Sequence, residues 1–262
     1  MIEGALLHFK GIGKKKRELL YQRGIIDWET SIKYSESIPL NSNKKDEYIR
    51  FLDEHIQAEK EKNIGFFVKH FHSEDKWRIL AKYFEDASFF DIETDGYFNR
   101  ITTISLYHNG NLFNYTRNQN LEDFLDKLQE LKLIVSFNGT SFDVPVVMQN
   151  FRIHEFPVPH LDLRWICYHE GIRGGLKEIE KILNIKRPGD LSGVDGMEAV
   201  LLWERWVRLN EQSSLEKLIK YCSADVLSLV KLSEKILSKK LKNFTAIDDG
   251  KIWELLDKNR SE

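Results

Sequence analysis

Two carboxylates one residue apart in an apolar stretch are the residues best placed to do chemistry. Asp91 and Glu93 lie in Ser-Phe-Phe-Asp-Ile-Glu-Thr, residues 88–94. This composition predicts a buried strand, on which residues i and i+2 project from the same face. Two carboxylates on one face repel each other unless a cation or further ligands compensate them. The pair therefore predicts one side of a site for a hard divalent metal ion.

Two acidic residues further along the chain are candidates for the rest of that site. Asp143 follows an apolar run, 133–135, and an Asn-Gly pair, which together predict a strand, a turn and a carboxylate beside the strand end. Asp225 lies in a segment, 214–239, whose apolar residues recur at helical spacing. On that predicted helix Tyr221 and Asp225 are four residues apart, so both side chains lie on one face.

Three motifs in this order carry a resemblance to a known family. Asp-Ile-Glu-Thr, then Asn-Gly-x-x-Phe-Asp, then Tyr-x-x-x-Asp resembles the exonuclease motifs of the DEDD superfamily, in its tyrosine-containing (DEDDy) branch. The residues of these motifs are most similar to those of the proofreading domain of family B DNA polymerases and of small ribonuclease H-like exonucleases with an N-terminal helix-hairpin-helix. The resemblance covers about residues 88–239. Each motif alone is common by chance, whereas three in order on the expected elements are specific.

The resemblance implies a catalytic role for five residues. Asp91, Glu93, Asp143 and Asp225 match the family's four metal-binding carboxylates, and Tyr221 matches the residue that positions or activates the attacking water. A phosphodiester is anionic and repels a nucleophile, so two divalent cations are needed to generate the nucleophile and stabilise the leaving 3′ oxygen. Oxygen-only ligands favour Mg²⁺ or Mn²⁺ over Zn²⁺. Because the ordinary pKa of tyrosine is about 10, we expect Tyr221 to orient the water by hydrogen bonding.

The motifs also imply contacts to substrate. The resemblance places Asn138 and Phe142 beside the terminal nucleotide, with Asn138 as a hydrogen-bond partner and Phe142 packed near it. Thr94 is a further candidate for substrate binding. The alternative is that Asn138 belongs to an ordinary turn and Phe142 to the core. A further acid, Asp162 in His-Leu-Asp-Leu-Arg, is interpreted as structural because four ligands already complete the constellation.

A basic segment near the N-terminus, about residues 8–31, resembles a helix-hairpin-helix unit with Gly11 and Gly13 in its tight turn. In such units the glycines let backbone N–H groups approach a phosphate, helped by the N-terminus of the following helix. Lys14 and the basic residues after it would add charge without reading bases. The alternative is an ordinary helical hairpin with a solvated basic face.

Charge and composition restrict the function classes. The net charge of the 262 residues is -2, which argues against broad electrostatic binding of nucleic acid and leaves a local phosphate contact open. Cys167 and Cys222 lie in apolar segments without metal-ligand spacing, which predicts buried, reduced thiols. His70 and His72 are two residues apart and cannot share a helix face, so we interpret them as core or surface histidines.

No apolar run is long enough for a membrane helix, and we expect a cytoplasmic protein without membrane partners.

The order of predicted elements indicates an α/β fold, namely a ribonuclease H-like mixed sheet flanked by helices, with a small N-terminal helical region. The predicted strands are 88–94, 100–108, 111–116, 133–137 and 160–166, and the predicted helices include 121–131, 141–151 and 214–239. We expect a helical region over 1–85, an exonuclease domain over 86–240, and a tail over 241–262 that is a short helix or partly disordered. The polar loop 186–196 either gates substrate or is a plain connector.

These inferences predict a metal-dependent exonuclease that acts on DNA or RNA, with a single-stranded end favoured. The resemblance implies 3′ to 5′ polarity and release of nucleoside monophosphates. A helicase or DNA repair protein is the expected kind of partner. Two alternatives stay open from the sequence: an adaptor that binds nucleic acid without cutting it, and a structure-selective endonuclease on the same scaffold.

Overall fold

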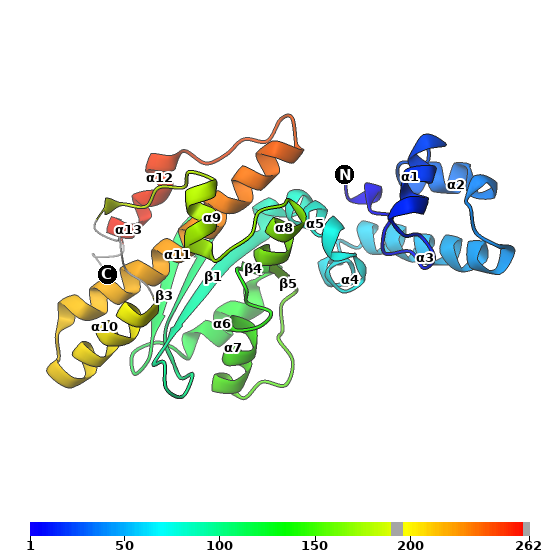
Figure 1. The fold of residues 1–262 in the computed structure, drawn as a ribbon. Coiled ribbons are helices and arrows are strands. Elements are labelled where there is room, and N and C mark those ends of the chain that lie inside the picture. Colours follow the sequence, from blue (N-terminus) through cyan, green and yellow to red (C-terminus); the bar gives the residue numbers. More distant parts are fainter. Residues whose placement is uncertain (190–195, 259–262) are drawn as a thin grey trace. The chain divides into compact units, whose positions relative to one another are not determined.

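The structure is a computed structural model that describes residues 1–189 and 196–258. The chain divides into two compact units, Met1–Phe84 and Glu85–Glu262, and each is described by itself (Figure 1). Among the described residues, no helix combines the length and apolar character that a membrane crossing requires.

The first unit is helical. Its α-helices are α1 (Lys14–Gln22), α2 (Trp28–Lys33), α3 (Ser42–Lys60), α4 (Ile64–His70) and α5 (Trp77–Lys82). Side-chain caps begin three of them: Asp27 accepts the N–H of Thr30, Asn41 that of Lys44, and Asn63 that of Phe66. Such caps satisfy backbone donors that a helix leaves unpaired at its first turn.

Aromatic rings and histidines fill the core of this unit. The rings of His8 and His55 lie 4.5 Å apart between centroids, and His8 stacks on Phe71 at 4.7 Å. Burial lowers the pKa of His8 to about 2 and that of His55 to about 4, so both are neutral core residues at pH 7. His70 packs against Phe66, with ring centroids 4.5 Å apart. His72 accepts the backbone N–H of Glu74 at the start of a short 3₁₀ turn.

The glycines of the predicted hairpin lie in a turn, as expected. The element before this turn differs from the helix that the motif requires. Gly11 has a φ of +87°, a conformation that favours glycine, and Gly13 is the N-cap of α1. Before them the chain forms only a 3₁₀ turn, Ile2–Gly4, where the motif would have its first α-helix. Lys14 forms an ion pair with Glu74 at 2.6 Å. The helix-hairpin-helix interpretation therefore stays a prediction.

The second unit is built on a five-stranded mixed sheet, as the sequence predicts. Its strands are β1 (Ala87–Thr94), β2 (Ile101–His108), β3 (Asn111–Thr116), β4 (Leu133–Ser136) and β5 (His160–Asp162), in the spatial order β3-β2-β1-β4-β5. The first three strands form an antiparallel meander, and β4 and β5 extend the sheet in parallel with β1. The central strand is thus β1, which carries Asp91 and Glu93.

Helices cover both faces of the sheet (Figure 1). On one face lie α6 (Asp123–Glu130) and α7 (Asp143–Phe151), and the long helix α11 (Gln212–Lys240) packs against β1 and β2 on the other. Strand alternation sorts the residues of β1 between the faces. Phe90 and Ile92 belong to the apolar core with α6 and α7, which leaves Asp91 and Glu93 for the face of α11. The remaining helices are α8 (Leu163–His169), α9 (Leu176–Ile182), α10 (Gly196–Leu209), α12 (Asp249–Trp253) and α13 (Leu255–Lys258).

The prediction of a strand over 160–166 is wrong beyond its third residue. The strand ends at Asp162, whose side chain accepts the N–H of Arg164 and begins α8. A short apolar run such as Leu-Arg-Trp-Ile-Cys fits a strand or a buried helix equally well by periodicity. The tail forms α12 and α13 and is held to α11 by Lys231, which pairs with Asp249 at 2.6 Å. Residues 190–195 of the polar loop 186–196 lie outside the described residues, so its two interpretations stay open.

Candidate active site

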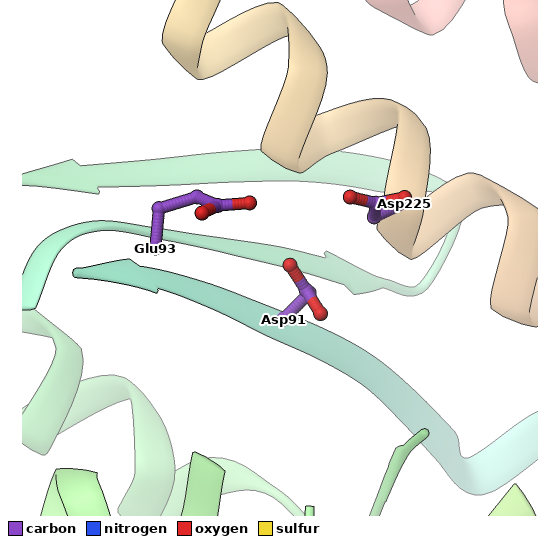
Figure 2. Close-up of side chains that lie close together, drawn as sticks. All are labelled: Asp91, Glu93 and Asp225. Atoms are coloured by element: carbon purple, nitrogen blue, oxygen red, sulfur yellow. The ribbon is translucent and has the colours of Figure 1, made fainter. Parts of the chain in front are cut away.

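Three of the four predicted carboxylates come together between β1 and α11. Asp91, Glu93 and Asp225 each offer an oxygen, and these atoms lie within 4.8 Å of one another. Figure 2 shows the two strand residues projecting toward Asp225 on the helix. The pairing of β1 with β2 shifts register between Glu93 and Thr94, at the end of the strand that carries the two carboxylates. The arrangement joins residues that are far apart in the sequence.

The fourth predicted carboxylate, Asp143, lies at the margin of this group. It is the first residue of α7 and only 3% of it is exposed. Burial raises its pKa to about 7, although hydrogen bonds from its own N–H and from that of Ile92 act in the opposite direction. Its charge raises the pKa of both Asp91 and Glu93. Asp143 therefore belongs electrostatically to the cluster without being one of the three closest ligands.

Burial and mutual repulsion set the protonation of the cluster. Burial raises the pKa of Asp91 and Glu93 well above the ordinary value, and the charges of Asp225 and Asp143 raise them further. Burial also raises the pKa of Cys222, so its thiol is protonated and donates to Asp91, at 3.4 Å from the backbone oxygen and 3.7 Å from Oδ2. Both cysteines are free and buried, as the sequence predicts. Without a compensating cation, the cluster resists full ionisation.

This electrostatics predicts that the metal-free protein loses stability as the pH rises. The carboxyls of Asp91, Glu93 and Asp143 have a pKa near 4 in the unfolded chain and a raised pKa when folded. The folded state therefore binds more protons over this interval, and its stability falls as the pH rises from about 4 through about 7 and beyond. Thermal denaturation in EDTA at about pH 7 and about pH 8.5 avoids the range in which His8 and His55 titrate. Adding Mg²⁺ or Mn²⁺ at the higher pH should restore the loss. A melting temperature that rises with pH in EDTA would contradict this account.

Two cations that the sequence analysis missed contact Asp225. Lys177 of α9 pairs with Oδ1 of Asp225 at 3.3 Å, and Arg187 donates to the same oxygen and to Glu180. Burial lowers the pKa of Arg187, but the charges of Asp225 and Glu180 outweigh burial and raise it overall. No spacing rule connects a loop arginine with a helix residue 38 positions later. The polar character of the loop was the only available signal.

Tyr221 lies one helical turn before Asp225 on α11 and is 4% exposed. Burial raises its pKa, and the charge of Asp225 raises it further. The Nζ atom of Lys177 lies 4.5 Å from the centroid of its ring. Tyr221 is therefore a protonated phenol, able to donate a hydrogen bond beside the carboxylates and unsuited to act as a base.

A tight turn after β4 carries Asn138 and leads to Asp143. Asn138 has a φ of +65°, and a side chain at Gly139 would overlap that of Ser136. Asp162 holds the turn by accepting the N–H groups of Asn138, at 2.8 Å, and Thr140, at 3.1 Å. These contacts support the structural interpretation of Asp162. They also account for the Asn-Gly pair, since asparagine tolerates the left-handed conformation and glycine permits the close approach.

The structure separates the predicted substrate-binding residues into different environments. Thr94 is buried, and its hydroxyl accepts the N–H of Gly96 at 3.4 Å. Phe142 packs against the apolar core with α6 and α7, in agreement with its core alternative. The side chain of Asn138 accepts a hydrogen bond from Arg164 and lines a surface pocket. The remaining three, Gly11, Gly13 and Lys14, belong to the first unit.

A comparison with models of known protein families agrees with the fold. The model of a family described as the RNase_H superfamily matches residues 88–237, more than half of the chain. Similar solved structures include the family B DNA polymerase from the hyperthermophilic archaeon Pyrobaculum calidifontis, at 16% identity and a TM-score of 0.47; the match covers 58% of this chain and 24% of the polymerase. No curated protein matches the sequence. With the mixed sheet that the sequence predicted now confirmed, the extent of the family match establishes that this chain belongs to the RNase_H superfamily.

Proposed function

We propose that this protein is a metal-dependent 3′ to 5′ exonuclease that hydrolyses phosphodiester bonds at a single-stranded end of DNA or RNA and releases nucleoside monophosphates. The observation that carries the proposal is the group of Asp91, Glu93 and Asp225, with oxygens within 4.8 Å of one another. Asp143 and Tyr221 lie beside this group, and the resemblance of the three motifs supplies the polarity and the product.

The residues fit two divalent cations by the chemistry of their donors. Carboxylate oxygens are hard ligands that suit Mg²⁺ and Mn²⁺. The pKa values of Asp91 and Glu93 are raised because burial and the neighbouring carboxylates disfavour ionisation. A bound cation would favour the ionised carboxylates. Asp91, Glu93, Asp143 and Asp225 would hold the ions. When bound, such ions supply an acidified water and stabilise charge on the leaving 3′ oxygen.

The protein's own groups position the reactants. Tyr221 donates a hydrogen bond that orients the attacking water, because its raised pKa keeps the phenol protonated. Lys177 and Arg187 fix the Asp225 carboxylate from the side of α9 and the following loop. The protonated thiol of Cys222 donates a hydrogen bond to the Asp91 carboxylate and helps to position it. A preorganised set of this kind needs little rearrangement when the substrate arrives.

Contacts to the rest of the substrate are part of the proposal. Asn138 and Thr94 would border the terminal nucleotide, and Phe142 would support them from the core side. In the first unit, Gly11 and Gly13 would present backbone N–H groups to a phosphate. Lys14 would add less charge than the sequence alone indicates, because Glu74 already pairs with it. A helicase or repair protein that supplies single-stranded ends is the proposed kind of partner.

The test uses purified protein and 5′-labelled single-stranded DNA and RNA oligonucleotides, with Mg²⁺, Mn²⁺ or EDTA, and resolves products by length. We expect a ladder that shortens from the 3′ end, absent in EDTA, with the stronger ladder revealing the preferred sugar. Intact substrate under every metal condition, with binding retained, would favour an adaptor instead.

A closed circular single strand is the matched control substrate. It offers no end, so an exonuclease leaves it intact while degrading the linear form of the same sequence. Degradation of the circle at a comparable rate would replace this proposal with the endonuclease alternative.

A further inference from the structure

A pocket of about 580 Å³ opens on the surface of the second unit. It is formed by the turn after β4, by α8, by the loop that follows α8, and by α9. The residues that matter for its chemistry are Asn138, Arg164, Trp165, Tyr168 and Arg173. Its volume lies in the range of sites that bind small ligands.

Two exposed aromatic rings line this pocket. Trp165 is 48% exposed and Tyr168 is 46% exposed, although large rings are usually well buried. Their centroids lie 6.1 Å apart with an interplanar angle of 71°, and the guanidinium of Arg173 lies 4.8 Å from the centroid of the Tyr168 ring. Aromatic surface of this kind stacks on nucleobases without regard to sequence.

The charge of the pocket is opposite to that of the carboxylate cluster. Arg164 and Arg173 line it, and none of the described residues that line it is acidic. Arg164 is held in place by its hydrogen bond to Asn138. Guanidinium groups bind phosphate oxygens through several donors. The pocket therefore favours a ligand that is both aromatic and anionic.

The pocket shares its supporting elements with the carboxylate cluster. Asn138 begins the turn that leads to Asp143, and β4 pairs directly with β1, the strand of Asp91 and Glu93. On the other side, Ile179 of α9 lines the pocket, and Lys177 of the same helix pairs with Asp225. A strand that entered the cluster would therefore have this pocket as its neighbour.

We propose that this pocket is a stacking subsite for one unpaired nucleotide of the substrate strand, and this inference rests on the proposed function. The base stacks on Trp165, the more exposed of the two rings, and Arg164 and Arg173 contact the flanking phosphates. Bases within a duplex are already stacked on their neighbours and cannot enter such a pocket without unpairing. The subsite thus explains, by a physical mechanism, a preference for single-stranded ends.

The test measures binding of a 3′-fluorescein-labelled thymidylate oligonucleotide by anisotropy in EDTA, where hydrolysis does not proceed. Stacking of one base contributes about 1–3 kcal/mol, so Trp165→Ala should weaken binding by about 5- to 150-fold. Trp165→Phe keeps a ring and should retain most of the affinity. Ile182→Ala is the matched control, because Ile182 is an exposed apolar residue of α9 that is not among the residues lining the pocket, and it should bind like the wild type.

An abasic scan separates stacking from a general structural effect. One abasic residue is moved stepwise along the oligonucleotide, and we expect a single position to lose affinity with the wild type. That loss should disappear with Trp165→Ala, since the partner ring is already missing. Equal affinity of the wild type and both Trp165 variants would overturn the subsite, as would a wild type that does not bind the oligonucleotide.

The failure of the subsite and the failure of the proposed function are distinguishable, because one is measured by binding and the other by hydrolysis. Stacking-dependent binding without any hydrolysis in Mg²⁺ or Mn²⁺ would refute the exonuclease and leave the subsite standing. Hydrolysis with binding that is indifferent to Trp165 would do the reverse.

Discussion

Replacing Asp91 by Asn is expected to lower the rate of phosphodiester hydrolysis by about a thousandfold or more, while making the metal-free protein more stable. The rate falls because metal-assisted stabilisation of the transition state supplies several kcal/mol. Stability rises because the substitution removes a carboxyl whose ionisation is opposed by burial and then by the charges of Asp225, Asp143 and Glu93. The amide oxygen can still accept the hydrogen bond from Cys222. Single-turnover hydrolysis and thermal denaturation in EDTA at about pH 8 measure the two effects.

A substitution that lowers the hydrolysis rate but raises the stability of the metal-free protein identifies a metal ligand. A residue that merely maintains the fold would lower both quantities. We expect the melting temperature of Asp91→Asn in EDTA to exceed that of the wild type by about 2 °C or more, and the stabilisation by Mg²⁺ to shrink. Asp126→Asn is the control, because Asp126 is an exposed carboxylate on α6, on the opposite face of the sheet; it should change neither quantity. If Asp91→Asn melts at a lower temperature and hydrolyses at the wild-type rate, the site has been assigned to the wrong residues.

Gly139→Ala is expected to destabilise the second unit by about 1–3 kcal/mol and to slow hydrolysis by about 100-fold. An added methyl group would overlap the hydroxyl of Ser136 and would lie 2.9 Å from its Cβ and 3.1 Å from Nε2 of His160. Those two side chains are hydrogen-bonded at 2.7 Å, so neither can move without loss. The turn would shift, and Asp143 would shift with it. Denaturant unfolding and single-turnover kinetics measure the effects.

Gly196→Ala provides the matched comparison. Gly196 begins α10, and an added Cβ would meet no heavy atom of the described residues within 4 Å. Alanine is the better helix former, so we expect unchanged or slightly higher stability and an unchanged rate. Equal behaviour of the two alanine variants would mean that the turn tolerates the methyl group and that close packing at Gly139 does not position Asp143.

Strand alternation and helical spacing, which are local features of the sequence, predicted which side chains share a face of each element. The alternation of β1 put Asp91 and Glu93 on one face, and helical spacing put Tyr221 and Asp225 on another, so the cluster followed from two short segments and a resemblance. Arg187 and Lys177 could not be predicted, because their pairing with Asp225 depends on how α9 and its loop pack against α11. The residues of α8 were wrongly predicted to continue a strand, because a short apolar run fits the periodicity of a strand and of a buried helix equally well.

The position of Asp225 on the last long helix affects when the site can form. The contact between Cys222 and Asp91 joins residues 131 positions apart, so it cannot form before both segments have been synthesised. A nascent chain therefore displays β1 long before α11 has been synthesised and docked. The proposed hydrolytic activity would be absent from every incomplete or partly folded form. Under the proposed function, the chain would therefore gain its cutting activity only once α11 docks on the sheet.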